Sequence, residues 1–127
     1  MNASPRILDH YIVECERYEA TLRVYLLIFE ALGRYREAVE NSKQKNKEKA
    51  VHKLNSAISA VEEALETQEN MMLNIEKTKA HYLIPQTMRD LTFMRTFLKN
   101  LLNKLYDYKD RYIQGEIHEL PKINLAS

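Results

Sequence analysis

The chain has 127 residues, of which 45% are hydrophobic and 29% charged, and its formal net charge at pH 7 is +1. This length predicts one domain that buries about two-thirds of the surface of its unfolded chain, and the small net charge argues against a dedicated polyanion binder. Only two glycines and three prolines are present, so little of the chain is expected in turns or linkers.

The N-terminal residues 1–5 contain no basic segment followed by an apolar stretch, so no signal peptide is expected. The longest uninterrupted apolar run, residues 24–29, is far shorter than the roughly 20 residues that span a bilayer. The single cysteine, Cys15, cannot form a disulfide within the chain and is expected as a buried thiol. These features favour a soluble cytoplasmic protein.

A first long helix is predicted over residues 5–41, because Ser4 can cap it and Pro5 suits its first position. Apolar residues recur along it at alternating steps of three and four: Leu8, Tyr11, Cys15, Tyr18, Leu22, Tyr25, Phe29 and Leu32. Such a 3.5-residue period forms a continuous stripe on which neighbouring helices pack and coil. A second stripe lies beside it and predicts neighbours on two sides: Val24, Ile28, Ala31, Tyr35 and Ala38.

Residues 41–47 are all polar and predict a turn, after which a second helix is expected over residues 47–82. Its apolar series has the same spacing and includes Val51, Leu54, Ile58, Val61 and Leu65. Ala50, Ala57 and Ala64 keep another side of this helix small, so a neighbouring helix can approach closely there.

Pro85 interrupts the pattern, and a third helix is predicted over residues 87–114, with Gly115 as its stop. Its apolar positions are Leu91, Met94, Leu98, Leu101, Leu105, Tyr108 and Tyr112. Residues 116–127 are too apolar for a solvated tail and are expected to form a strap or a short helix. The predicted fold is therefore all-α: an antiparallel bundle of three long helices in a single domain over residues 1–127.

The unequal predicted lengths suggest a binding surface. If the third helix stops short of the turn at residues 41–47, about two helical turns of the first two helices stay uncovered. The apolar residues left there are Leu32, Tyr35, Val39, Val51, Leu54 and Ile58. The C-terminal tail, a second copy of the chain or a partner is expected to cover them, because a monomer rarely exposes such a patch.

Tyrosine is the most distinctive residue type, with eight tyrosines and no tryptophan. A tyrosine ring is apolar while its hydroxyl requires a polar partner, which suits interfaces better than a dry core. Tyr106, Tyr108 and Tyr112 form a second group near the end of the third helix and are added to the predicted partner-binding residues. Packing at the edge of the bundle is the alternative explanation.

We expect no enzyme activity, cofactor or metal site. The four histidines are far apart, and none has an acidic residue three positions before it, as di-iron bundles require. The sequence also has no glycine-rich phosphate loop and no nucleophile elbow.

Two alternatives remain open. The segment from His52 to Ile58, followed by Val61 and Leu65, resembles the phospho-accepting helix of histidine phosphotransfer domains, and the resemblance implies phosphotransfer through His52. The lysine cluster over residues 43–53 would instead suit an accessory bundle that contacts nucleic acid, although no aromatic residues lie between these lysines and a solvated turn is the simpler explanation.

The overall layout resembles the flagellar and type III export chaperones of the FliS, FliT and FlgN kind. The similar segments are residues 27–38, residues 50–65 and the tyrosine-rich segment 105–112. The resemblance implies a non-enzymatic cytoplasmic bundle that shelters an amphipathic helix of a partner in a groove. We therefore expect a protein-binding module, either an export chaperone or an adaptor, that is able to self-associate.

Overall fold

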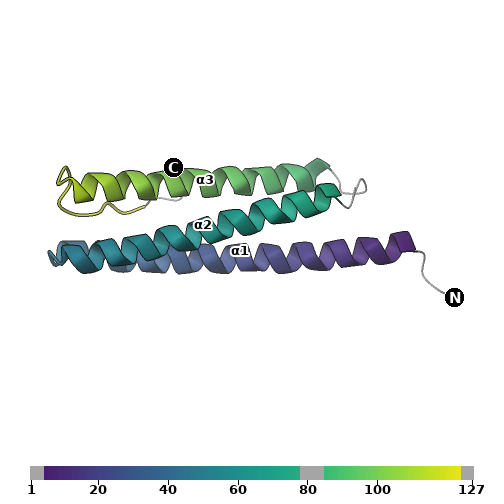
Figure 1. Ribbon diagram of the computed structural model, residues 1–127, viewed down its shortest axis with the longest axis horizontal. Coiled ribbons are helices and arrows are strands. Elements are labelled where there is room, and N and C mark those ends of the chain that lie inside the picture. The colour runs from purple at the N-terminus through teal and green to yellow at the C-terminus, as the bar shows by residue number, and fades with distance from the viewer. Residues whose placement is uncertain (1–4, 78–84, 124–127) are drawn as a thin grey trace.

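The computed structural model describes residues 5–77 and 85–123 and contains three long helices (Figure 1). These are α1 (Pro5–Lys43), α2 (Lys47–Lys77) and α3 (Pro85–Ile113), and successive helices run antiparallel. Residues 114–123 follow as a non-helical strap. The predicted all-α bundle with a C-terminal strap is confirmed, and residues 78–82 of the predicted second helix lie outside the described residues.

The same backbone motif ends α1 and α3. Lys45 (φ 60°) and Gly115 (φ 80°) both adopt the left-handed conformation. After α1, the Asn46 amide donates to the Asn41 carbonyl (2.9 Å), and after α3 the Glu116 amide donates to the Arg111 carbonyl (2.9 Å). This pattern satisfies carbonyl groups that the helix ends would otherwise leave free. The predicted stop at Gly115 is therefore confirmed.

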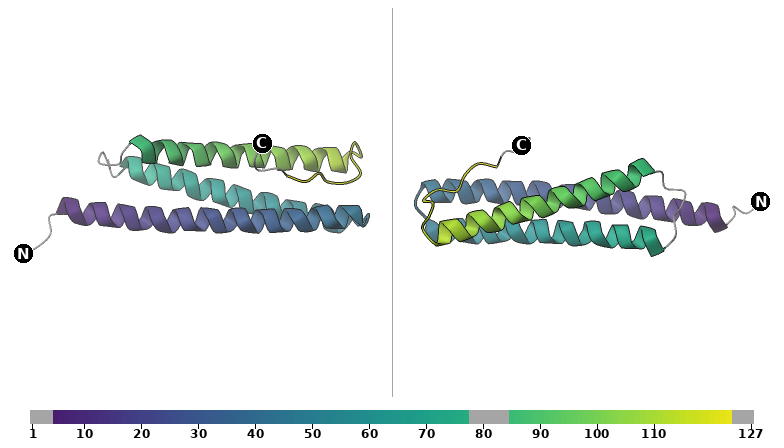
Figure 2. Two further views of the ribbon diagram at one scale, coloured as in Figure 1. Left: turned by 180° about the vertical axis from the view of Figure 1, so that it is seen from behind. Right: turned by 90° about the horizontal axis from the view of Figure 1, so that it is seen from above.

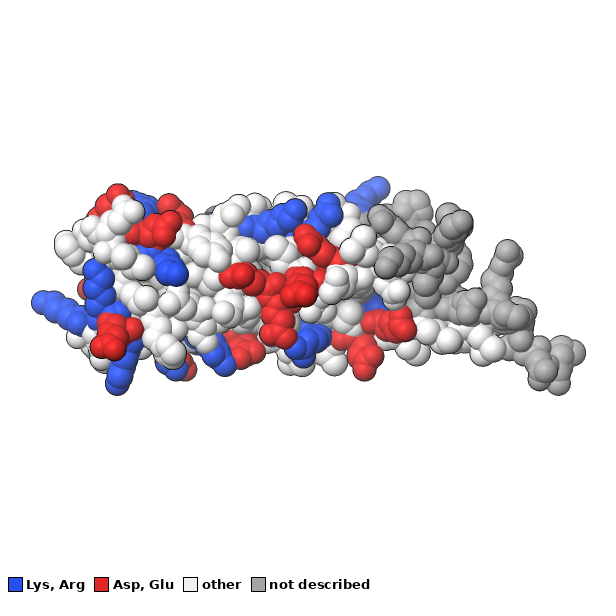
Figure 3. All heavy atoms as spheres, in the orientation of Figure 1, with Lys and Arg blue, Asp and Glu red and all other residues white. Residues whose placement is uncertain are grey.

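Lysines gather at the end of the bundle where α1 and α3 finish and α2 begins (Figure 3). Lysines at the start of a helix are unfavourable for that helix's own dipole. Lys47 instead stabilises the C-terminal end of α3, because its Nζ lies 3.3 Å from the Ile113 carbonyl and 5.5 Å from the centre of the Tyr112 ring. The C-termini of α1 and α3 and the N-terminus of α2 meet at this end of the bundle. Because a helix C-terminus carries partial negative charge, two C-termini outweigh one N-terminus and favour positive side chains here.

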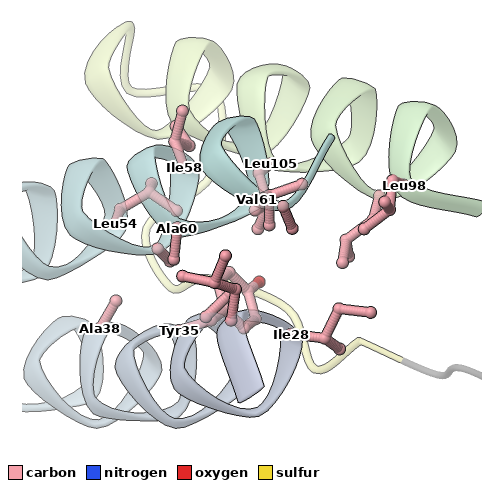
Figure 4. Close-up of a cluster of buried hydrophobic side chains, with 14 of the residues drawn as sticks. Ile28, Tyr35, Ala38, Leu54, Ile58, Ala60, Val61, Leu98 and Leu105 are labelled. Carbon is pink, nitrogen blue, oxygen red and sulfur yellow. The ribbon is translucent and has the colours of Figure 1, made fainter. Parts of the chain in front are cut away.

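The core is a continuous cluster contributed by all three helices and the strap (Figure 4). Ala50, Ala57 and Ala64 of α2 are each 0% exposed, and α1 places Ala31 and Ala38 in the same cluster. Alanines on both helices let α1 and α2 approach closely, as predicted for α2. From α3, Leu98, Leu101 and Leu105 fill the space between the other two helices.

The strap turns back from the end of α3 and crosses to α1 (Figure 2). Leu120 is buried in the core cluster, and its amide donates to Ser42 Oγ at 3.0 Å. The Ser42 hydroxyl in turn donates to the Val39 carbonyl (2.7 Å), and the Tyr35 hydroxyl donates to the carbonyl of Pro121. The strap is thus an integral part of the bundle.

One geometric prediction is wrong: the third helix does not stop short of the first turn. The contact between Lys47 and Ile113 places the end of α3 beside the start of α2. The reason is that α2 and α3 have similar lengths, 31 and 29 residues, while α1 is the long helix with 39. The excess length lies at the N-terminal end of α1, which extends past the described end of α2 (Figure 1). None of the described helices is long and apolar enough to cross a lipid bilayer.

Candidate protein-binding surface

Helix α1 is apolar on two opposite sides, and only one of them faces the bundle. The side that faces α2 and α3 carries Val24, Leu27, Ile28, Ala31, Tyr35 and Ala38, all buried. The other side carries a row of large apolar residues that are 46% to 69% exposed, which we call the α1 stripe: Leu8, Tyr11, Ile12, Tyr18, Leu22, Tyr25, Leu26 and Phe29. A helix that is apolar all round normally has neighbours on all sides.

The prediction that the heptad row of α1 packs against the other helices of this chain is wrong. Seven of its eight members are exposed, including Cys15, which was expected as a buried thiol. The physical reason is side-chain size: the second row contains Ala31 and Ala38, which allow close packing against the alanines of α2, whereas a row of tyrosines would hold the two helices apart. A 3.5-residue period identifies an apolar row but not the molecule that packs on it.

The exposed area of the α1 stripe is large for a chain of this size. Eight large apolar side chains exposed by about half or more present on the order of 800–1,000 Å², since an aromatic side chain alone buries about 150–250 Å² in a core. The largest apolar patch of a typical monomer is about 300–600 Å². One partner in a standard protein–protein interface contributes about 800 Å². The α1 stripe therefore has the size of one side of an interface.

A groove of about 550 Å³ runs along one edge of the α1 stripe. Leu22, Leu26 and Leu27 form its apolar part, and Glu16, Glu19 and Glu30 are the acidic residues that line it. Its one basic residue, Arg23, forms an ion pair with Glu63 of α2. The groove can accept an apolar side chain, and its rim favours positive charge.

The predicted partner-binding residues come from all three helices, toward the end of the bundle where α1 and α3 finish, and are mostly inside the fold. Tyr35, Val39, Leu54, Ile58 and Tyr112 are buried, Leu32, Val51 and Tyr108 are half-buried, and Tyr106 is exposed. The C-terminal tail, a second copy and a partner were the three segments expected to cover those from α1 and α2. In the structure the C-terminal strap packs in the same core cluster as these residues. A cavity of about 450 Å³ remains between the strap and α1, lined by Leu32, Tyr35, Val39 and Ile123 among others.

The tyrosine group around α3 is held by specific contacts. The rings of Tyr35 and Tyr108 lie 6.3 Å apart, and the Tyr106 hydroxyl donates to the Glu62 carboxylate at 2.7 Å. That hydrogen bond is the main reason why the pKa of Tyr106 is raised. Burial raises the pKa of Tyr35 and of Tyr112, and Tyr108 adds to the effect at Tyr35. Tyr35, Tyr108 and Tyr112 pack at the boundary of the bundle, and partner binding through the exposed Tyr106 stays a prediction.

The raised pKa values of the buried Tyr35 and Tyr112 predict alkaline destabilisation. The folded-state pKa values of these two tyrosines lie above the unfolded value of about 10, so folding favours the neutral phenols. The stability that the neutral phenols contribute is complete below pH 10 and is lost as the pH rises through the folded-state pKa values. We expect the free energy of unfolding, measured by urea denaturation, to fall between pH 10 and 12. Tyr35→Phe should make that fall shallower, and at pH 7 it should cost about 0.5–1.5 kcal/mol through the lost bond to Pro121. Equal pH slopes for the two proteins would contradict this prediction.

His52 is exposed on α2, as phosphotransfer would require. Two of the polar side chains that follow it contact α1. Lys53 forms an ion pair with Glu37 (2.9 Å), which lowers the pKa of Glu37, and Ser56 accepts a hydrogen bond from Arg34. Phosphotransfer through His52 stays a prediction. In residues 5–77 and 85–123, no group of three or more His, Cys, Asp or Glu side chains could hold a metal ion.

Of the lysines in the cluster over residues 43–53, Lys47 contacts the end of α3 and Lys53 is paired with Glu37. These contacts account for two of the five lysines without nucleic acid, and nucleic-acid contact stays a prediction. Comparison with known families, curated proteins and solved structures finds no match to this chain.

Proposed function

We propose that this chain is a non-enzymatic, cytoplasmic protein-binding module that shelters an amphipathic helix of a partner, as an export chaperone or an adaptor does. The observation that supports the proposal is the α1 stripe: eight large apolar side chains in a helical row, each 46% to 69% exposed on the side of α1 that faces away from α2 and α3. Burial of such a row on a partner helix is a common mode of helix recognition. The expected site is therefore the α1 stripe over residues 8–29, not the region near the lysine-rich turn.

The remainder of the fold suits this role. The core cluster and the strap hold the buried side of α1 from Val24 to Ser42, and Thr21 and Glu16 contact α2 nearer the N-terminus. A rigid helix presents its outer residues without paying the cost of ordering them on binding. Tyrosine and phenylalanine are well suited to anchor such an interface, because they bury a large apolar area with few rotatable bonds.

Two exposed phenylalanines provide a matched test. Phe29 belongs to the α1 stripe and is 69% exposed, and Phe93 lies on α3 and is 77% exposed. With photoreactive benzoylphenylalanine at one position or the other in the source cells, position 29 is expected to give a discrete cross-linked adduct with another polypeptide, identified by mass spectrometry. Position 93 should give only background. Equal cross-linking at the two positions would contradict the proposed site.

A further inference from the structure

The partner helix should also have a recognisable charge. We infer that the occupant of the α1 stripe is an α-helix of another protein that carries lysine or arginine beside its apolar residues. This inference rests on the proposed function and adds the chemistry of the partner. Three features carry it: the spacing of the stripe, the charge of its edges, and the poor fit of a second copy of this chain.

The spacing indicates a helical occupant. Residues 8–29 of the stripe lie on one uninterrupted helix and span about 32 Å at 1.5 Å per residue. Most of them follow the three-and-four alternation of a coiled-coil seam, in which each apolar side chain fits between residues of a facing helix. A strand cannot match this period, because its side chains alternate every two residues. The occupant is therefore a helix of at least about 22 residues.

The edges of the stripe are acidic. Among the positions that directly flank the heptad row, the charged residues are Glu14 and Glu19, and Glu16 and Glu30 lie further out.

Three described arginines of α1 near the stripe have glutamate partners within the chain, and Arg36, one heptad after Phe29, is exposed. Arg17 pairs with Glu14 (2.9 Å), Arg23 with Glu63, and Arg34 with Glu30. Glu16 accepts a hydrogen bond from the uncharged amide of Asn74 (2.7 Å) and Glu19 is exposed, so negative charge is left in excess at this edge. A helix with basic flanking residues would complement that charge.

A second copy of this chain fits the edges poorly. In a parallel pairing of two α1 helices, Glu14 of one copy would face Glu19 of the other, because these positions flank the seam five residues apart. In a centred antiparallel pairing, Glu19 would lie beside its own counterpart near the two-fold axis. Both arrangements place like charges together at the interface, which opposes association.

The test uses two labelled synthetic helical peptides with the same apolar series, one flanked by lysine and the other by glutamate. In fluorescence anisotropy with the full chain at 50 mM salt, the lysine peptide is expected to bind at least about tenfold more tightly, and 0.5 M salt should shrink this difference. Glu19→Lys should weaken the lysine peptide about three- to tenfold and strengthen the glutamate peptide. Glu119→Lys, on the exposed side of the strap, is the matched control and should leave the ratio unchanged.

Three other results would contradict the partner's charge, the docking surface or the identity of the occupant. Equal affinity of the two peptides would overturn the inference about charge and leave the docking surface in place. Failure of both peptides to bind would overturn the docking surface as well. A dimer in light scattering that Tyr18→Lys converts to monomer would show that a second copy occupies the stripe, and the inference would be wrong.

Discussion

Replacement of Leu120 by alanine is expected to lower the free energy of unfolding by about 2–4 kcal/mol. Leu120 is 3% exposed and belongs to the same core cluster as residues of all three helices, although it lies on a strap without helical structure. Truncation of a buried leucine removes transfer free energy and leaves a cavity where the neighbours cannot collapse. Urea denaturation followed by ellipticity at 222 nm measures the loss.

The adjacent residue supplies the control for this prediction. Glu119 is exposed, and Glu119→Ala should change the free energy of unfolding by less than about 0.5 kcal/mol. The native ellipticity should be the same in both variants, because the strap contributes no helix. A Leu120→Ala protein as stable as Glu119→Ala would mean that the strap is not part of the core, and that the surface near Tyr35 and Val39 is open to a partner after all.

Helix positions could be predicted from the sequence because their signals are local. Pro5, the polar break at residues 41–47 and Gly115 act on the neighbouring backbone alone, and the observed ends of α1 and α3 lie within two residues of the predicted ones. The alanine series of α2 was equally readable, since small side chains on one side of a helix are useful mainly where another helix approaches. These features need no knowledge of the rest of the fold.

The contacts between helices could not be read in the same way. Two apolar rows on α1 satisfy the same periodicity, and the choice between them depends on whether Ala31 or Tyr25 fits against α2, which is a property of both surfaces together. The prediction of where α3 ends relative to the first turn rested on the predicted lengths of the three helices. Each residue by which a predicted boundary is wrong shifts the end of a helix by about 1.5 Å. For these two reasons the site expected near the lysine-rich turn differs from the exposed apolar surface at residues 8–29 of α1.

Replacement of Leu105 by alanine is expected to lower the free energy of unfolding by about 2–5 kcal/mol. Leu105 is 1% exposed and points from α3 toward the space between α1 and α2, beside Val61 (Figure 4). Leu98 and Leu105 help to join α3 to the rest of the core, so the cavity left by the shorter side chain would weaken the attachment of the whole helix. Ile113→Ala, at an exposed position of the same helix, is the control and should cost less than about 1 kcal/mol.

The same variant also separates stability from binding. Leu105 belongs to the core cluster that packs on the buried side of α1. The α1 stripe lies on the opposite, exposed side of α1. Under conditions in which Leu105→Ala remains folded, its affinity for the lysine-flanked peptide should stay within about twofold of the unmodified chain, while the urea midpoint falls. A parallel loss of both would mean that the peptide binds between the helices, in place of α3, and not on the outer face of α1. The two readouts therefore distinguish a partner that docks on the finished bundle from one that enters it.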